Sequence, residues 1–180
     1  WIVKPERSLT ADPRLEALIG HLQRLLPEPS QAQSFRHAMV AEPRVDVRVN
    51  RLLPVAGAFA ERLRPLCEPV AWCRDAMRLP PDLAATVSHS LEYRLGALYM
   101  QAKATTLAVC ALDPQPGELI LDLAAAPGGK ATQIATAMNN SGLLVANDPR
   151  QKRVAALVGN LERSGACNTL VTSALGGPLA

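Results

Sequence analysis

The feature that most constrains the fold is an alternation of short apolar runs with helical patterns in the last third of the chain. The segments Leu119–Leu121 and Leu143–Asn147 have the composition of buried strands, and Thr169–Val171 begins a third. Between them, apolar residues recur at helical spacing over residues 131–138 and 154–161. Strands that alternate with helices over short connections form parallel sheets, so we predict a doubly wound, Rossmann-like α/β sheet.

The first part of the chain has a different pattern. Asp12 as N-cap and Pro13 as first residue predict a helix whose apolar face comprises Leu15, Leu18, Ile19, Leu22 and Leu26. The segment Arg44–Asn50 alternates strictly, with valines on one side and Arg44, Asp46 and Arg48 on the other. This alternation predicts a half-buried strand.

Helical spacing returns over Val55–Leu66, and Pro69–Leu79 is predicted to form a hairpin around Arg74 and Asp75. We therefore expect a small α+β domain over residues 1–80. Two further helices are predicted at Leu91–Tyr99 and Thr105–Leu112. They open the second domain, residues 81–180, which we interpret as the first half of a Rossmann-like domain.

Composition excludes several classes of protein. None of the apolar runs in the 180 residues approaches the ~18 that a membrane span needs, and the N-terminus has no apolar signal region, so we expect a cytoplasmic protein without a membrane partner. The four cysteines are scattered and the three histidines stand alone, which argues against a metal site. We expect a monomer.

Charge is unevenly distributed along the chain. Residues 1–112 carry 14 basic and 11 acidic side chains, whereas residues 113–180 carry 5 of each. Arginine accounts for 15 of the 19 basic residues, and its planar guanidinium binds phosphate well. The first part of the chain is therefore compatible with a polyanionic partner, although arginine as a solubilising surface residue explains the composition equally well.

The turn after the first predicted strand of the sheet is a candidate binding site, because ligands bind beyond the carboxyl ends of parallel strands. Small residues there let a ligand approach the backbone, and the amides that open the next helix can bind an anion. The candidate residues of this turn are Ala124, Ala125, Ala126, Pro127, Gly128, Gly129 and Lys130.

Asp148 follows the second strand, 20 residues after Gly128, where a carboxylate can accept both hydroxyls of a ribose. The turn departs from the G-x-G-x-x-G pattern of nicotinamide sites, so we favour a methionine-bearing nucleoside as ligand. Asp122 at the end of the first strand is expected to orient the turn or to bind the ligand amine. The alternatives are a turn shaped only for packing and an aspartate that caps a helix.

These residues carry a resemblance to a known family. The segment from Tyr99 to Asn168, with LDLAAAPGGK, then Asn-Asp, then R-x-x-x-L-x-x-N-x-x-R-x-G, resembles the S-adenosylmethionine-binding core of the Sun/NSUN RNA (cytosine-5)-methyltransferases. The likeness is greatest to the bacterial members that modify small-subunit ribosomal RNA. The triplets RVN, beginning at Arg48, and AWC, ending at Cys73, are similar to the RNA-recognition portion of that family.

The resemblance implies S-adenosyl-L-methionine as cofactor and RNA as substrate. By position, Ala124 to Lys130 match the loop on the methionine part, Asp148 matches the ribose-binding acid, and Arg153 matches a cofactor-site arginine. The implied chemistry is addition of a cysteine thiolate to carbon 6 of cytosine, which activates carbon 5 for methylation. That cysteine belongs to a Pro-Cys motif after a fourth strand, so we expect this chain to be a truncated and inactive fragment with no catalytic residue of its own.

Two alternatives remain open from the residues. The chain would be a non-catalytic RNA-binding or assembly module if the parent protein lacks the Pro-Cys motif. A nicotinamide-dependent dehydrogenase would bind NAD in place of S-adenosylmethionine.

Overall fold

The structure, a computed structural model, describes residues 13–25, 28–40 and 44–175, and the chain divides into two compact units, residues 1–43 and 44–180. The first unit contains α1 (Pro13–Leu25) and α2 (Pro29–Val40). Ile19 is buried, and Arg36 on α2 forms an ion pair with Glu16 on α1. The predicted helix is thus present, whereas Asp12, its expected N-cap, and Leu26 lie outside the described residues.

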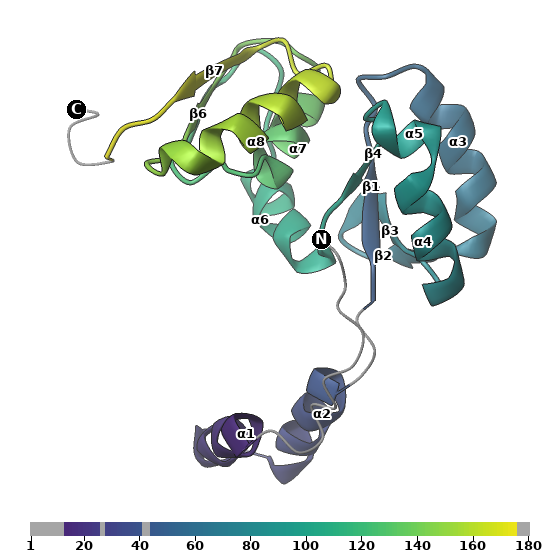
Figure 1. The fold of residues 1–180 in the computed structure, drawn as a ribbon, viewed down its shortest axis with the longest axis vertical. Coiled ribbons are helices and arrows are strands. Elements are labelled where there is room, and N and C mark those ends of the chain that lie inside the picture. Colours follow the sequence, from purple (N-terminus) through teal and green to yellow (C-terminus); the bar gives the residue numbers. More distant parts are fainter. Residues whose placement is uncertain (1–12, 26–27, 41–43, 176–180) are drawn as a thin grey trace. The chain divides into compact units, whose positions relative to one another are not determined.

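The second unit begins with an antiparallel sheet of four strands in the order β2-β3-β1-β4. Its strands are β1 (Asp46–Val49), β2 (Glu68–Val70), β3 (Cys73–Arg78) and β4 (Leu98–Met100). The helices associated with it are α3 (Val55–Leu63), the 3-10 turn η2 (Arg64–Leu66), α4 (Pro81–His89) and α5 (Leu91–Arg94). Figure 1 shows α3, α4 and α5 on one side of this sheet, where valines of β1 join their core.

Two details of the sequence interpretation are wrong here. The hairpin turns at Ala71 and Trp72, and Arg74 and Asp75 lie within β3, because β2 and β3 pair from Val70 and Cys73 outward. The predicted helix Leu91–Tyr99 ends at Arg94, since Gly96 at φ +81° breaks it and β4 follows. Because β4 pairs with β1, the first sheet continues to Met100, past the expected division at residue 80.

Strand β1 is buried on both faces, which corrects the expectation of a half-buried strand. All four of its residues are buried, including Asp46 and Arg48. The side that carries these polar residues does not face water, because α6 (Lys103–Leu112) and α7 (Gly129–Ala137) cover it. Strict alternation shows only that the two faces of a strand differ in polarity. Here the polar face lies in a buried junction between the first sheet and helices α6 and α7.

The Arg48 side chain crosses this junction and is only 2% exposed. Its Nε donates to Oε1 of Gln101 at 3.0 Å, and its Nη2 donates to Oγ1 of Thr132 on α7 at 2.8 Å. Desolvation lowers the pKa of Arg48 to about 10, so the guanidinium is still charged near neutral pH. A buried charge held by neutral oxygens fixes the distance and orientation of α7 against the first sheet.

Asn50, just after β1, makes a second set of contacts across the unit. Its Nδ2 donates to the carbonyl oxygens of Gly96, at 2.9 Å, and Ser164, at 2.8 Å. Its Oδ1 accepts from Oγ1 of Thr136 on α7 at 3.2 Å. The amide of Asn50 thereby connects the first sheet to the two helices that flank the second.

The second sheet is parallel, with β5 (Leu119–Asp122), β6 (Leu143–Asn147) and β7 (Thr169–Thr172) in the order β5-β6-β7. Helices α7 and α8 (Gln151–Arg163) form the crossovers. One face of the sheet packs on them through a core that includes Ile120, Leu144, Ala146 and Leu157. The predicted α/β fold with a Rossmann-like parallel sheet is confirmed.

The other face of this sheet is apolar and exposed. Leu119 is 74% exposed, and Leu121, Leu143 and Leu170 on the same face are also exposed. The expectation that β5 is fully buried is therefore wrong for the described residues. A parallel sheet usually carries helices on both faces, and in the described part of the chain only one face carries them.

Gly96 sits where the backbone of the first sheet meets α8. A Cβ placed on it would lie 2.0 Å from the carbonyl oxygen of Arg163, and its φ of +81° is one that L side chains rarely adopt. We predict that Gly96→Ala lowers the free energy of unfolding by at least about 2 kcal/mol, measured by urea denaturation. The control Gly159→Ala, on α8 with open space around it, should be neutral or slightly stabilising. Equal stability of the two variants would contradict this account.

The buried Arg48 should contribute more to the free energy of unfolding than an exposed arginine near it. We predict that Arg48→Ala costs about 3 kcal/mol of unfolding free energy, because it leaves a void and removes the donor to Gln101 and Thr132. Arg51, whose exposed side chain pairs with Asp75, is the matched control, and Arg51→Ala should cost about 1 kcal/mol or less. Chemical denaturation followed by circular dichroism measures both, and a similar cost for the two would show that Arg48 does not hold the junction.

Candidate functional site

The turn between β5 and α7 contains the residues singled out from the sequence. Ala125, Ala126 and Gly128 are buried, whereas Ala124 and Pro127 are exposed. Gly128 has φ +115°, and a Cβ there would meet Asn160 and Leu157 of α8 at 3.3 and 3.4 Å. Gly129 and Lys130 begin α7, so the free amides of its first turn open at the carboxyl end of β5.

Asp122 ends β5 and is buried at the start of this turn. Its Oδ1 accepts from the backbone N–H of Ala124 at 3.2 Å, which is the orienting role expected from the sequence. Its Oδ2 is buried without a hydrogen-bond partner among the described residues, and Nζ of Lys130 lies 3.7 Å away. A buried carboxylate oxygen without a donor is a site where a ligand N–H can bind.

Asp148 lies one strand over and is directed at the same turn. Its Oδ2 accepts from the backbone N–H of Ala126 at 3.3 Å, and its Oδ1 accepts from the N–H of Arg150 at 3.0 Å. The side chain is only 1% exposed. The carboxylate therefore binds the backbone just before α8 and joins the end of β6 to the turn after β5.

Arg153, on the first turn of α8, covers this carboxylate. Its Nη1 lies 3.2 Å from Oδ2 of Asp148, and its Nη2 donates to the carbonyl oxygen of Ala126. The Arg153 side chain is 43% exposed, so solvent reaches the guanidinium although both of its partners are buried. A hydroxyl-bearing ligand would reach Asp148 by taking the place of this guanidinium.

Sequence reasoning gave no role to two asparagines that shape the site. Nδ2 of Asn160 on α8 donates to the carbonyl oxygen of Pro127 at 2.8 Å, which ties the turn to this helix. The buried Asn147 donates to the carbonyl oxygens of Leu123 and Ala174 at 3.2 and 3.0 Å. Both asparagines belong to the motifs that carry the family resemblance, so the sequence marks them as candidates. Their spacing does not show that they bind backbone carbonyl groups.

The residues of the N-terminal triplets fall into two groups. Arg48 and Asn50 are buried in the junction described above, whereas Trp72 is partly exposed. Nε1 of Trp72 donates to Oγ1 of Thr106 on α6 at 3.0 Å, and Nζ of Lys103 lies 5.6 Å from its ring centroid. Two of these triplet residues therefore hold the fold together.

None of the four cysteines lies at the carboxyl edge of the second sheet. Cys67 and Cys73 belong to the first sheet region, and Cys110 is on α6, before β5. Cys167 precedes β7 and so lies at the opposite, amino edge. Within the described ranges, there is no group of three or more His, Cys, Asp or Glu residues that could hold a metal ion, and no helix could span a membrane.

Comparison with known proteins agrees with this geometry. Residues 109–176 match the family model described as 16S rRNA methyltransferase RsmB/F. Proteins named ribosomal RNA small subunit methyltransferase F are similar to most of the chain. The one from Shewanella amazonensis is 33% identical over 162 residues, covering 87% of this chain and 35% of the relative. The one from Vibrio cholerae is 33% identical over 164 residues, 88% of this chain and 35% of the relative.

Solved structures show the same fold. A methyltransferase homologue from Pyrococcus horikoshii is 27% identical, with a TM-score of 0.69 over 91% of this chain and 57% of that protein. NSun6 from the same organism, solved with SFG, shares the fold at 16% identity, with a TM-score of 0.71 over 88% of this chain and 65% of that one.

The chain spans about a third of the length of the curated relatives named above. Its resemblance to the Sun/NSUN methyltransferases is confirmed, and residues 109–176 are similar to the RsmB/F family model.

Proposed function

We propose that this chain is the cofactor-binding part of an RNA (cytosine-5)-methyltransferase that uses S-adenosyl-L-methionine and acts on small-subunit ribosomal RNA. The observation that carries the proposal is the pairing of two buried carboxylates around one turn. Asp122 has an oxygen without a hydrogen-bond partner, and Asp148 is directed at the same backbone from the next strand. The family match of residues 109–176 supports the same assignment.

The residues present fit the cofactor. Oδ2 of Asp122, which has an ion-pair partner in Lys130 but no hydrogen bond, would accept from the ammonium of the methionine part. The first-turn amides of α7 would bind its carboxylate. Asp148 would accept the ribose hydroxyls, and Ala124, Ala125 and Ala126 leave the backbone open to close approach. When bound, the cofactor supplies a methyl group on a sulfonium, which is transferred to a nucleophilic carbon.

The remaining residues of the site have separate tasks in this arrangement. Lys130, beside Asp122 and bonded to the carbonyl oxygen of Ala124 at 3.3 Å, holds the turn and balances the carboxylate. Arg153 forms an ion pair with Asp148 when the cofactor is absent, and the ribose hydroxyls would replace the guanidinium at this carboxylate. Gly128 leaves room for α8 to pack against the turn, Pro127 accepts a hydrogen bond from Asn160 of that helix, and Gly129 lies beside Tyr99 and Gln101.

We propose that the first sheet contacts RNA. This extends to the whole sheet the RNA-recognition role that the sequence suggests for residues 1–80. The excess of basic side chains in residues 1–112 and the exposed Trp72 support this assignment. We further propose that the protein acts as a monomer in the cytoplasm.

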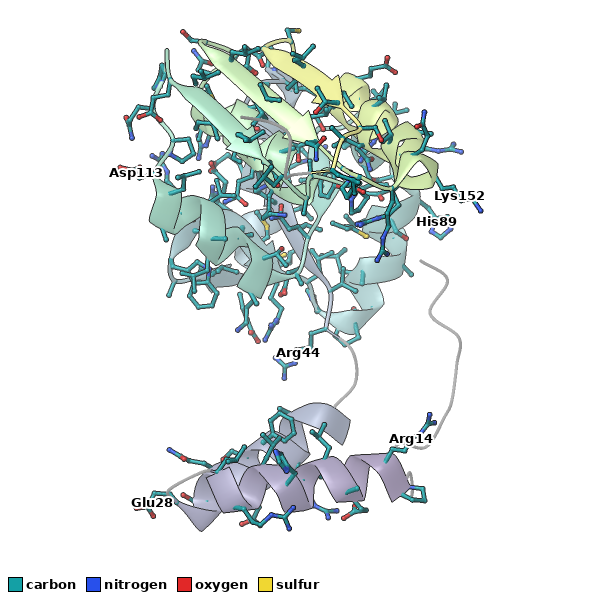
Figure 2. The ribbon with its side chains drawn as sticks, turned by 90° about the vertical axis from the view of Figure 1, so that its left-hand side faces the viewer. Arg14, Glu28, Arg44, His89, Asp113 and Lys152 are labelled. Carbon is teal, nitrogen blue, oxygen red and sulfur yellow. The ribbon has the colours of Figure 1, made fainter. Side chains whose placement is uncertain are left out.

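The role of Asp148 is tested by calorimetric titration with S-adenosylmethionine. We predict that Asp148→Asn weakens binding by about 1–3 kcal/mol, the scale of a lost hydrogen bond to a charged group. Asparagine keeps one acceptor oxygen for the backbone, and melting curves check that the fold is retained. Asp113→Asn is the control, because Asp113 is exposed at the surface and has a φ of 49° that asparagine tolerates (Figure 2).

Unchanged affinity in Asp148→Asn would remove Asp148 from the site. Absence of S-adenosylmethionine binding by the unmodified chain would overturn the proposed function. Tight binding of NAD in the same titration would favour a dehydrogenase.

We predict that residues 1–180 bind the cofactor but do not transfer its methyl group to RNA. The reason is that every cysteine of the chain lies away from the carboxyl edge of the second sheet, where the cofactor and the target base would meet. Incubation with small-subunit ribosomal RNA and cofactor labelled on the methyl group measures transfer. Label in the RNA that disappears when one of the four cysteines is replaced by serine would contradict this prediction.

A further inference from the structure

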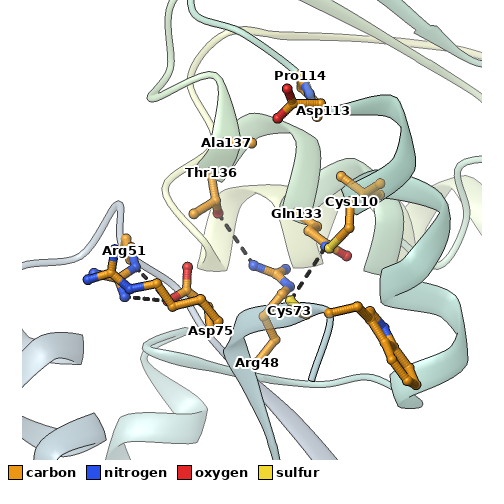
Figure 3. Close-up of a pocket in the computed structure, with 13 residues that line it drawn as sticks. Arg48, Arg51, Cys73, Asp75, Cys110, Asp113, Pro114, Gln133, Thr136 and Ala137 are labelled. Atoms are coloured by element: carbon orange, nitrogen blue, oxygen red, sulfur yellow. Dashed lines mark hydrogen bonds and ion pairs between the residues drawn. The ribbon is translucent and has the colours of Figure 1, made fainter. Parts of the chain in front are cut away.

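A pocket of about 350 Å³ lies where α6 and α7 pack against the first sheet. Its lining includes two cysteines from distant parts of the chain, Cys73 in β3 and Cys110 on α6 (Figure 3). Cys73 is 6% exposed, whereas Cys110 is more open to the pocket. Both thiols are free, and neither takes part in the cofactor site described above.

The two thiols lie close together. Nε2 of Gln133 on α7 is 3.9 Å from Sγ of Cys73 and 3.7 Å from Sγ of Cys110, so one amide group donates weak hydrogen bonds to both sulfurs. Figure 3 shows the three side chains converging from three different elements. Burial raises the pKa of the Cys110 thiol, and its hydrogen bond and charge interaction with Cys73 add to the rise.

A cation stands beside this pair. The buried guanidinium of Arg48 interacts electrostatically with Cys73 and with Cys110. Thiol–disulfide exchange requires a thiolate as attacking group. Because the pKa of Cys110 is raised, its thiolate becomes more populated as the pH rises above neutral. The pocket therefore combines two adjacent sulfurs, a fixed positive charge and an opening to solvent on the side of Cys110.

We propose that Cys73 and Cys110 form an oxidisable dithiol site, which closes to an intramolecular disulfide when a small disulfide such as oxidised glutathione enters the pocket. The thiolate of Cys110, the more open sulfur, attacks one sulfur of the oxidant and releases one molecule of glutathione as thiolate. The thiolate of Cys73 then attacks Sγ of the mixed disulfide on Cys110 and releases the second. Two protein thiols are oxidised, their protons pass to solvent, and one oxidant is reduced to two thiols.

The resulting bond would join β3 to α6. It would covalently connect the first sheet to the helix that leads into β5, across the junction that Arg48 now holds by hydrogen bonds alone. The proposal does not depend on which ligand the second sheet binds.

The test is oxidation of the native 180-residue chain with oxidised glutathione, followed by alkylation, proteolysis and mass spectrometry. We expect a peptide pair linked through Cys73 and Cys110, while Cys67 and Cys167 remain outside that link. The melting temperature should rise by several degrees, because the link lowers the conformational entropy of the unfolded chain. Dithiothreitol should restore both free thiols and the original melting temperature.

Two variants separate the roles of the sulfurs. In Cys73→Ser, the glutathione adduct on Cys110 should persist, because the resolving thiol is absent. The control Cys167→Ser removes an exposed thiol and should leave the Cys73–Cys110 link unchanged. The proposal is overturned if, in the unmodified chain, Cys73 stays fully alkylated, or if Cys110 pairs with Cys67, with Cys167 or with another molecule. Because the disulfide is identified by mass spectrometry in the unmodified chain, the test remains valid even if Cys73→Ser fails to fold.

Discussion

The burial of one guanidinium between the first sheet and helix α7 organises the larger unit of this protein. Arg48 leaves a strand of the first sheet, ends among oxygen atoms of α7 and of the segment after β4, and has no carboxylate within ion-pair distance in the described part of the chain. A guanidinium removed from water needs acceptor oxygens in fixed positions, so the first sheet and α7 have little freedom to slide past each other. The turn that opens α7 is therefore positioned partly from the first sheet. The N-terminal sheet thus contributes to the geometry of a site at the end of the second sheet.

The elements of the second sheet could be predicted from the sequence because their cause is local. Apolar runs, a small-residue turn and helical spacing over residues 119–171 specify strand, turn and helix wherever they occur. The burial of β1 could not be predicted in this way, because alternation shows that Arg48 and Val47 face opposite sides but not what covers each side. The helix expected to reach Tyr99 failed for a similar reason. Leu98 belongs to a strand because it pairs with Val49 of β1, and Gly96, with its positive φ, ends the preceding helix.

The candidate site shows the same division. Ala124 to Lys130, Asp122 and Asp148 were selected from their place at strand ends, and the structure brings them around one turn. The contacts that shape this turn come from α8, where Asn160 binds Pro127 and Arg153 covers Asp148. A sequence motif on a helix thus corresponds to hydrogen bonds to a backbone more than 20 residues away. Such bonds depend on tertiary packing, and residue spacing alone does not specify them.

The exposed leucines of the second sheet affect how the protein behaves in solution. Leu119, Leu121, Leu143 and Leu170 form an apolar wall on a chain whose formal net charge is only +3. Charge repulsion between molecules is correspondingly weak, and excluded salts such as sulfate strengthen the association of apolar surfaces. The chain should therefore salt out early in ammonium sulfate, and added arginine or mild detergent should keep it dispersed. The exposed face of the second sheet thus contributes directly to the colloidal behaviour of the chain.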